Sequence, residues 1–301
     1  MKVSIITISF NNLKGLMKTY QSIMRQTFRD YEWIVIDGDS SDGTKEFLQE
    51  HNAEIAYWCC EPDKGVYNAQ NKGTEHAKGE YCIYMNSGDS FYDDDVLKKV
   101  FDKNIDADVI YGNWMLIFED GKTRLGCAPE VADLAYFFDD NMCHQSMLIK
   151  TDAVLNRPYD ESFRIYADWD EWLALYMQGK KFERVNLTIC NFMVGGISTG
   201  DNASEELKQE RKAEIKRINE RYYSEPLQKT MKRIAPILRE YNALKSWMGD
   251  DDSMSLGANS YERKFLLEKR RKHNKIIRIL IYVSSLLLVT NILTLLYMLC
   301  N

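Results

Sequence analysis

The stretch YCIYMNSGD, from Tyr81 to Asp89, decides the predicted fold. Aromatic and apolar residues run from Tyr81 to Met85, as in a short buried strand, and the polar residues from Asn86 to Asp89 then end it in a turn. Asp89 therefore stands at the carboxyl end of a strand, where open α/β sheets bind ligands. Gly88 would let a charged ligand approach the backbone closely. An ordinary Asx turn would also explain the sequence Ser87-Gly88-Asp89. The rest of the chain must decide between a structural turn and a ligand site.

Strand and helix patterns alternate before this stretch. The strand patterns are Lys2–Phe10, Tyr31–Asp37 and Ile55–Cys59, and the helical patterns are the residues after Asn12, those from Thr44 on, and Val66–Lys78. This alternation over about the first hundred residues predicts an α/β fold with a doubly wound, mainly parallel sheet.

The second half of the chain is less regular. Strands are predicted at Val109–Gly112, Trp114–Phe118, Met147–Ile149 and Val185–Val194, a hairpin turn at Glu119–Lys122, and helices at Asp168–Gly179 and Ser204–Tyr222. Residues 223–275 show no clear pattern, and a loop is predicted at Gly249–Gly257.

The composition excludes some classes of protein. A formal net charge of -6 and a pI near 5.4 argue against a general nucleic-acid binder, because such proteins carry a basic face. The seven cysteines lack zinc-ligand spacing and are accompanied by only four histidines, so we expect reduced thiols in a cytosolic compartment. Met1-Lys2 leads directly into a strand pattern, which predicts no signal peptide.

The last part of the chain predicts a membrane anchor. Ile279–Leu299 holds 21 residues without a charge, which as a helix would span about 30 Å, the thickness of a bilayer core. Eight Lys or Arg lie just before it, between Arg263 and Arg278, so the body of the protein is expected on the cytoplasmic side. These cations could also bind anionic lipid headgroups. A buried core helix is the alternative. The predicted division is 1–222 for the globular domain, 223–275 for a helical linker and basic juxtamembrane segment, and 276–300 for a single transmembrane helix.

Three carboxylates stand at or near the carboxyl ends of predicted strands: Asp37, Asp89 and Asp168. A doubly wound sheet aligns such ends, so these residues could meet in one cleft. The chain has no GxGxxG motif after its first strand and no GxxxxGK[ST] motif, which argues against a dinucleotide fold and a P-loop. A nucleotide site made of side chains and a metal ion remains.

Several motifs, in this order, resemble family 2 glycosyltransferases of the GT-A fold. They are TISFNN at Thr7–Asn12, EWIVIDGDSSDGT at Glu32–Thr44, EPDKGVYNAQNKG at Glu61–Gly73, GEYCIYMNSGD at Gly79–Asp89, HQ at His144-Gln145 and ADWDEW at Ala167–Trp172. The resemblance covers about residues 1 to 200. It implies inverting transfer of a sugar from a nucleoside diphosphate sugar, with Mn²⁺ or Mg²⁺ as cofactor.

The resemblance also implies nucleotide-binding residues. Thr7 and Phe10 would line the base pocket, and Asp37 would accept hydrogen bonds from the uracil or the ribose. The alternative for Asp37, a helix cap, fits Asp42 better. The role of Asp39 stays open. Other contacts to the nucleotide sugar are expected from Asp63, Lys64, Asn71, Lys72, Ser87 and Gly88, with surface salt bridges as the alternative for the first four.

Asp89 is the expected metal ligand. The family motif is Asp-x-Asp, and here only its last acid is kept, so one carboxylate plus diphosphate oxygens and waters would hold the ion. Weaker metal binding is expected as a result. The nearby run Asp93–Asp95 is interpreted as acidic residues at the start of a helix.

Asp168 is the expected catalytic base, since a weakly nucleophilic hydroxyl needs a carboxylate to take its proton. Asp170 and Glu171 are the rivals. The acceptor side is expected to include His144, Gln145, Trp169 and Trp172, with core packing the alternative for both tryptophans. The run Gly195–Ser198 could close over the donor phosphates.

The resulting hypothesis is a membrane-anchored, cytoplasm-facing glycosyltransferase. It would transfer a hexose or N-acetylhexosamine, from a UDP-sugar by family habit, to a lipid-linked saccharide acceptor in cell-surface polysaccharide synthesis. One alternative is a catalytically idle nucleotide-sugar-binding scaffold of an assembly complex, because one acid of the metal motif is missing and Ala167 replaces the usual Glu. Another is a sugar-phosphate nucleotidyltransferase, which the lack of a Gly-rich, Arg-containing loop after the first strand disfavours.

Overall fold

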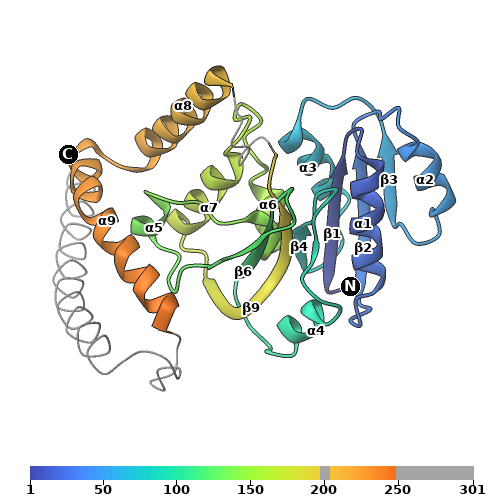
Figure 1. Cartoon of the computed structure of the whole chain (residues 1–301), viewed down its shortest axis with the longest axis horizontal. Coiled ribbons are helices and arrows are strands. Elements are labelled where there is room, and N and C mark those ends of the chain that lie inside the picture. Colours follow the sequence, from blue (N-terminus) through green and yellow to red (C-terminus); the bar gives the residue numbers. More distant parts are fainter. Residues whose placement is uncertain (197–203, 249–301) are drawn as a thin grey trace, which may run out of the picture. The chain divides into compact units, whose positions relative to one another are not determined.

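The computed structural model describes residues 1–196 and 204–248 of the chain (Figure 1). The chain divides into two compact units, Met1–Gln228 and Lys229–Asn301. The first unit contains the sheet and every predicted site residue.

The described residues form one nine-stranded mixed sheet, with the strand order β3-β2-β1-β4-β8-β6-β9-β5 and β7 paired to β6. The strands are β1 (Val3–Ser9), β2 (Tyr31–Asp37), β3 (Tyr57–Cys60), β4 (Tyr81–Tyr84), β5 (Ser90–Phe91), β6 (Val109–Ile117), β7 (Thr123–Gly126), β8 (Met147–Lys150) and β9 (Phe182–Met193). The pairs among β1 to β4 are all parallel, as predicted. Beyond them, β8 runs antiparallel to both β4 and β6, so the second half of the sheet is mixed. The two strands predicted within 109–118 are one strand, β6, with a register shift near Asn113.

The helices follow the predicted order. They are α1 (Leu13–Met24), α2 (Thr44–Glu50), α3 (Val66–Glu75), α4 (Val96–Phe101), α5 (Leu134–Phe137), α6 (Thr151–Asn156), α7 (Ala167–Met177), α8 (Glu205–Tyr222) and α9 (Glu225–Met248), with a short 3₁₀ turn, η1, at His144–Ser146. Helix α9 lies within 223–275, where a helical linker was predicted although the sequence shows no clear periodic pattern. Pro236 lies inside α9, and a proline in a helix interior normally argues against a helix.

Helices cover both faces of the parallel strands, which confirms the doubly wound arrangement (Figure 1). On one face, Val3 and Ile5 of β1 belong to a buried core with Leu16 and Ile23 of α1. On the other face, α3 packs against β1 and β2. There a Cβ on Gly73 would lie only 2.5 Å from Ile6 Cγ2, so this glycine lets α3 lie close to the sheet. Alternate side chains of β1 thus fill two separate layers.

The register brings the carboxyl ends of the first strands to one edge of the sheet. Ser9 at the end of β1 pairs with Asp37, and Asp37 pairs with Cys60 at the end of β3. The turn after β4 reaches the same edge, because β4 is parallel to β1. The predicted site residues that follow these strands therefore gather there.

No helix within 1–196 or 204–248 combines the length and apolar character that a membrane crossing needs. The predicted span Ile279–Leu299, the basic run Arg263–Arg278 and the loop Gly249–Gly257 lie outside the described residues. The predicted division at 222 and 275 stays a prediction.

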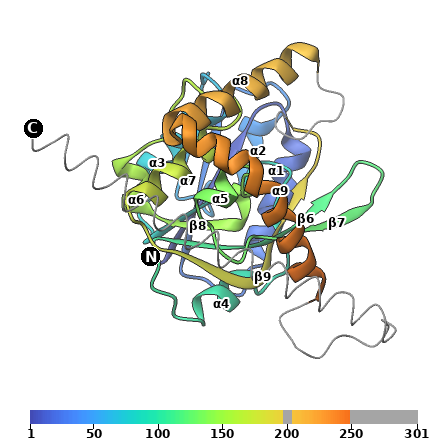
Figure 2. The same cartoon turned by 90° about the vertical axis from the view of Figure 1, so that its left-hand side faces the viewer.

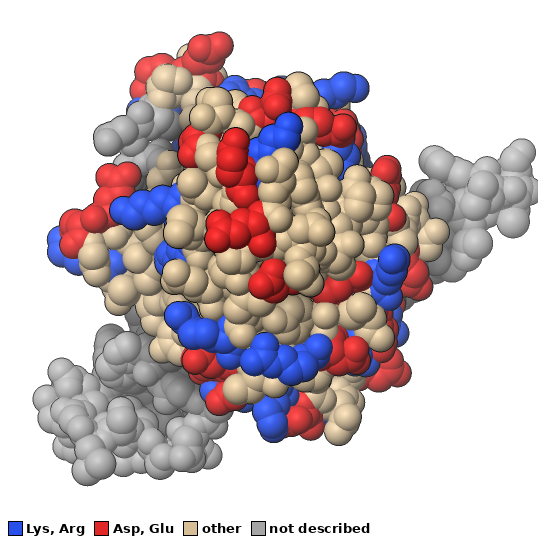
Figure 3. Space-filling model, turned by 90° about the vertical axis from the view of Figure 1, so that its right-hand side faces the viewer, with Lys and Arg blue, Asp and Glu red and all other residues tan. Residues whose placement is uncertain are grey.

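The surface at the α2 and β3 end mixes charges of both signs. Figure 3 shows acidic and basic side chains interspersed with uncharged ones on this face.

The acidic run after β5 makes structural contacts. Asp93 pairs with Lys99, Asp94 pairs with Arg25, and Asp95 accepts a hydrogen bond from Thr27. The six cysteines in the described part of the chain are free thiols, as predicted.

Candidate active site

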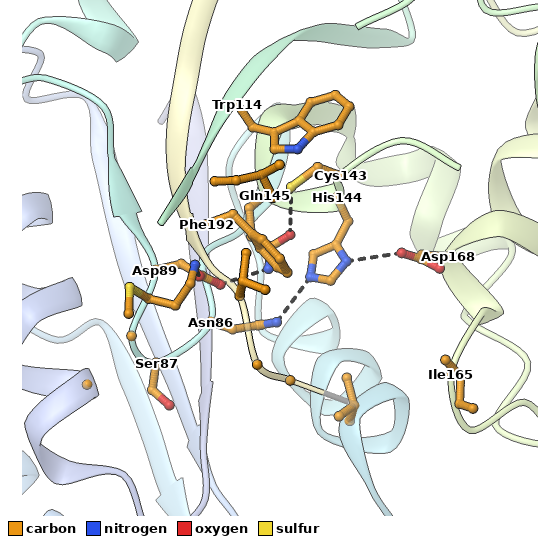
Figure 4. Close-up of a pocket in the computed structure, with 18 of the residues that line it drawn as sticks. Asn86, Ser87, Asp89, Trp114, Cys143, His144, Gln145, Ile165, Asp168 and Phe192 are labelled. Atoms are coloured by element: carbon orange, nitrogen blue, oxygen red, sulfur yellow. Dashed lines mark hydrogen bonds and ion pairs between the residues drawn. The ribbon is translucent and has the colours of Figure 1, made fainter. Parts of the chain in front are cut away.

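A cavity of about 1010 Å³ opens at this edge of the sheet (Figure 4). Its wall is formed by the turn after β4, the start of α1, the segment from Asp140 to Gln145, the start of α7, and residues of β6 and β9. Asp89 and Asp168 both line it. Two of the three predicted carboxylates therefore share one cavity.

The turn from Asn86 to Asp89 is held by α1. The Asn12 side-chain amide donates to the Ser87 carbonyl (3.0 Å) and to Ser87 Oγ (3.1 Å). Lys18 Nζ donates to the Gly88 carbonyl (2.9 Å), and the Gly88 amide donates to Thr19 Oγ1 (3.0 Å). Gly88 has φ of 104°, a left-handed conformation that favours glycine. Ser87 and Gly88 line the cavity, where a diphosphate would find a lysine beside it.

Asp89 is held on both oxygens and is only 5% exposed. Oδ1 accepts from the Met193 amide (2.9 Å) and Oδ2 accepts from Gln145 Nε2 (2.7 Å). Burial raises the pKa of the Asp89 carboxyl to about 6. Gln145 Oε1 accepts in turn from Cys143 Sγ (3.1 Å). Gln145, which we expected on the acceptor side, therefore orients the predicted metal ligand.

Asp89 could hold a divalent cation only together with ligands that the protein does not supply. No cluster of three His, Cys, Asp or Glu that could hold a metal ion occurs within residues 1–196 and 204–248. A carboxylate has about four lone-pair sites, and the two hydrogen bonds at Asp89 leave one on each oxygen. Asp89 can therefore ligate Mn²⁺ or Mg²⁺ if diphosphate oxygens and waters complete the shell.

Asp168 lies in the first turn of α7 and accepts four hydrogen bonds. Oδ1 accepts from the Trp169 amide (2.8 Å), Asn141 Nδ2 (3.1 Å) and the Tyr67 hydroxyl (3.2 Å). Oδ2 lies 3.1 Å from His144 Nδ1. Tyr67 has a single hydroxyl proton, which it also donates to the Ile165 carbonyl (2.6 Å). The Trp169 and Asn141 donors therefore fill Oδ1, whereas Oδ2 keeps a lone pair for a substrate. The carboxylate is thus fixed, with one oxygen available to take a proton.

His144 links Asp168 to the turn after β4. The Asn86 side-chain nitrogen, a donor, lies 3.0 Å from His144 Nε2. The ring must accept there, so it carries its proton on Nδ1 and donates to Asp168. Figure 4 shows this chain running from Asn86 through His144 to Asp168. The imidazole thus orients the carboxylate.

The two alternative candidates for the base, Asp170 and Glu171, pair with arginines outside the cavity. Asp170 is fully buried and accepts from Arg157 Nη2 and Arg221 Nη1, both at 2.7 Å. Glu171, also fully buried, pairs with Arg157. Neither acid lines the cavity. They connect α7 to Arg157 and to α8, which is a structural role.

The two tryptophans of the same motif belong to the core, which corrects their assignment to the acceptor side. Trp172 is fully buried, and Trp169 is 5% exposed and donates its indole N–H to the Phe137 carbonyl (2.7 Å). Nine of the eleven residues of α7 are buried. A helix buried on nearly all sides cannot present these rings to a substrate.

The predicted nucleoside residues gather beside the cavity rather than in its wall. Phe10 is 65% exposed, and a Cβ on Gly38 would lie 3.1 Å from its ring and 2.7 Å from Asp63 Oδ2, so Phe10 and Asp63 flank Gly38. Asp37, directly before Gly38, accepts from the Ser40 amide (2.8 Å) and hydroxyl (2.6 Å). Asp37 is also fully buried and accepts from Cys60 Sγ (3.0 Å), which argues against its predicted contact with the nucleoside, whereas the exposed ring of Phe10 beside the Asp63 carboxylate suits a base and its ribose.

Two asparagines connect the nucleoside residues to the cavity. The Asn11 amide donates to Ser40 Oγ (2.7 Å), and Ser40 is the residue that binds Asp37. Asn12, next in sequence, binds Ser87 in the cavity. The loops after β1, β2 and β4 are thus joined at one edge of the sheet.

Four other predicted residues have structural partners. Thr7 is fully buried and accepts from the Trp33 indole (2.9 Å), which argues against its predicted contact with a base. The Asn71 side chain binds both backbone groups of Tyr159. Lys72 pairs with Glu61 at 2.6 Å. Lys64 lies on the exposed loop before α3, where its amide donates to Asn68 Oδ1 (3.1 Å).

Sequence reasoning missed several cavity residues. Lys14 and Lys18 both line the cavity, and their spacing of four on a predicted helix places them on one face, a signal that could have been used. Tyr67, which lies within the Glu61–Gly73 motif but was given no role, and Asn141, which lies in no motif, also bind Asp168. Gly195 and Gly196 line the cavity, whereas Ile197 and Ser198 lie outside the described residues.

Relatives of the chain are glycosyltransferases by name. An uncharacterized glycosyltransferase of Mycobacterium tuberculosis is 45% identical over 96 residues, covering 32% of this chain and 37% of the relative. A PGL/p-HBAD biosynthesis glycosyltransferase of Mycobacterium bovis is 30% identical over 174 residues, covering 56% and 66%. The chain thus matches less than two thirds of the length of both. The uncharacterized glycosyltransferase YwdF of Bacillus subtilis is 26% identical over 233 residues, covering 74% and 84%.

A solved structure shares the fold. The crystal structure of residues 1–349 of Staphylococcus aureus TarS in complex with UDP-GlcNAc aligns with a TM-score of 0.58 at 15% identity, over 89% of this chain and 79% of that one. Residues 4–163, more than half of the chain, match the model of the family described as Glycosyl transferase family 2. The chain therefore belongs to glycosyl transferase family 2.

Proposed function

We propose that the protein is an inverting, metal-dependent glycosyltransferase that uses Asp168 as its base. It transfers a hexose or N-acetylhexosamine from a nucleoside diphosphate sugar, a UDP-sugar, to a lipid-linked saccharide in cell-surface polysaccharide synthesis. The observation that carries the proposal is the shared cavity: Asp89 and Asp168 line it together, one in the turn after β4 that Lys18 contacts and the other with a free lone pair. The relatives' names and the UDP-GlcNAc complex of TarS support the choice of donor.

In this mechanism each residue has one role. Phe10 stacks on the base, Asp63 beside it accepts from the nucleoside, and Lys18 with the Ser87-Gly88 turn binds the diphosphate. Asp89 would hold the metal ion, which would supply positive charge to stabilise the departing diphosphate. Asp168 Oδ2 accepts the proton of the acceptor hydroxyl as its oxygen attacks the anomeric carbon from the face opposite the diphosphate. A single displacement of this kind inverts the anomeric centre.

The membrane part of the proposal rests on the sequence. An anchor at Ile279–Leu299, preceded by the basic run Arg263–Arg278, would hold the catalytic domain at the cytoplasmic surface. Tethering raises the effective concentration of the enzyme at a membrane-bound acceptor.

The test combines binding and turnover in the full-length chain. Thermal shifts with UDP, GDP and TDP sugars plus Mn²⁺ identify the donor, and hydrolysis of that donor without acceptor shows that the site is active. Asp168→Asn is expected to abolish transfer and to keep donor affinity, because it removes the proton acceptor and keeps Oδ1 with its hydrogen bonds. EDTA is expected to slow turnover. Unchanged turnover of Asp168→Asn would refute the base, and indifference to EDTA would refute the metal ligand.

A further inference from the structure

One wall of the cavity is apolar and has no part in the chemistry above. Trp114 and Leu116 come from β6, and Phe192 and Val194 come from the end of β9 and just after it. Side chains two residues apart on a strand face the same side, and the register pairs Leu116 with Phe192 across β6 and β9. The regular alternation of these strands therefore builds a continuous apolar surface facing the cavity.

Gly126 fixes the place of Trp114 in this wall. The two residues are partners across the β6–β7 hairpin, which Figure 2 shows extending from the sheet. A Cβ on Gly126 would lie 2.2 Å from both Cε2 and Nε1 of the indole. The ring occupies the space that any side chain at 126 would need. Glycine at this position therefore lets the indole lie across β7.

Trp114 is only half-buried and lines the cavity. Its indole N–H makes no hydrogen bond to any other residue of the described chain. The other side of the ring plane, away from β7, is thus a flat apolar surface, and the ring carries a donor that a ligand hydroxyl could use. Phe192 extends the surface toward the centre of the cavity, as Figure 4 shows.

The cavity that this surface faces also holds polar side chains, among them Glu119, Asn141 and Arg164. A flat apolar platform in a cavity with polar groups suits a sugar ring, which has C–H groups on one face and hydroxyls at its edge. An alkyl chain would cover the platform but give the indole N–H no acceptor, so the wall is matched to a saccharide better than to lipid.

The platform and the base line the same cavity. Figure 4 draws Cys143 and His144 between Trp114 and Asp168, and His144 bonds Asp168. The cavity volume of about 1010 Å³ is at the upper end of the range of ligand sites, so a second ring can lie beside the donor. We propose that Trp114, placed by Gly126, is the platform on which the acceptor's reacting sugar ring stacks. This inference rests on the proposed function.

The test uses methyl glycosides of glucose, galactose, mannose and N-acetylglucosamine as probes. They are titrated into the full-length chain with UDP and Mn²⁺ by ligand-observed NMR, with 1-butanol as an apolar probe that lacks a ring. At least one glycoside is expected to bind. Trp114→Ala is expected to weaken its binding about tenfold, and Trp114→Phe less. Gly126→Ala is expected to match Trp114→Ala although it keeps the indole.

The controls separate the possible failures. Trp58→Ala is the matched control, because Trp58 lies on β3, bonds Asn52 and does not line the cavity. UDP affinity is expected to stay unchanged in Gly126→Ala and Trp58→Ala, and unfolding midpoints identify variants that fail to fold. The inference would be overturned if glycoside affinity were unchanged in both Trp114→Ala and Gly126→Ala. It would also be overturned if the same two variants weakened the binding of butanol. A chain that binds UDP but no glycoside would overturn it too, whereas a chain that binds no nucleotide would refute the proposed function itself.

Discussion

Asp170 and Asp168 lie two residues apart in one motif, and replacing each by Asn should separate stability from catalysis. Asp170 is fully buried, and each of its oxygens accepts from an arginine at 2.7 Å. In Asp170→Asn the arginines keep their charges while one oxygen becomes an amide that repels a guanidinium. Removing one partner of a buried ion pair costs about 3–5 kcal/mol, because the remaining charge is left uncompensated.

Asp168→Asn should lower the free energy of unfolding far less than Asp170→Asn does. Asn keeps an oxygen for the donors that bind Oδ1, and the only hydrogen bond that is lost is the one from His144 Nδ1. The loss is about 1 kcal/mol or less. For a domain of this size about 1 kcal/mol corresponds to about 2–4 °C in midpoint, so Asp170→Asn should unfold about 6–20 °C below wild type and Asp168→Asn within a few degrees of it.

Thermal unfolding and sugar transfer are measured on the same full-length samples. Below its midpoint, Asp170→Asn should keep the transfer rate of wild type within a few-fold, since its side chain does not line the cavity. Asp168→Asn should be folded and inactive. The reasoning would be refuted if Asp170→Asn lost transfer with an unchanged midpoint, since Asp170 would then be the base, or if both variants unfolded alike.

Three further predictions concern pH and donor binding. Burial raises the pKa of Glu171 to about 7 from 4.5, so its contribution to stability is full below about pH 4.5 and is lost as pH rises through 7. Glu171→Gln should therefore lose less stability than wild type between pH 5 and 8, by up to about 3 kcal/mol, in urea unfolding at each pH. Lys18→Met should weaken UDP binding about tenfold or more in calorimetry, because a charge-assisted hydrogen bond is lost beside the diphosphate. Phe10→Ala should weaken UDP binding about tenfold, with an unchanged midpoint because the ring is exposed.

Matched variants check these three results. Lys72→Met removes a lysine that pairs with Glu61 outside the cavity, so its UDP affinity should stay near that of wild type. Phe10→Tyr keeps a ring for stacking and should bind UDP normally. An equal loss in Lys18→Met and Lys72→Met would point to general charge attraction. A pH profile of Glu171→Gln that follows wild type would show that another group titrates.

The sequence predicted what local patterns determine. Tyr31–Asp37 has the same bounds as β2, because seven consecutive residues suit a buried strand and a turn follows directly. Asp89 was predicted at the cleft because parallel strands align their carboxyl ends, whereas Asp168 reaches it from the first turn of α7, which does not follow a strand, and Asp37 does not line it. The identity of neighbouring side chains was not predictable in this way. Arg221, which binds Asp170, is 51 residues away on α8.

The wrong predictions have a common cause. Trp169 and Trp172 follow the motif that contains the base, and the apolar pattern of α7 cannot tell a helix with one buried face from a helix buried almost all round. Trp114 was not proposed because its position depends on pairing with Gly126 in β7, and strand register is not visible in a single sequence. Aromatic residues could be recognised in the sequence, but their exposure could not.

One short segment fixes both acids of the cavity. Asn141 and His144 donate to Asp168, and Gln145, next to His144, donates to Asp89. A single displacement requires the attacking hydroxyl and the leaving diphosphate to lie in line, so the separation of base and metal ligand must be constant. Two independent loops would allow that separation to vary. The turn η1 sets it through adjacent side chains, which explains why the HQ pair accompanies the acids although neither residue needs to touch the reacting atoms.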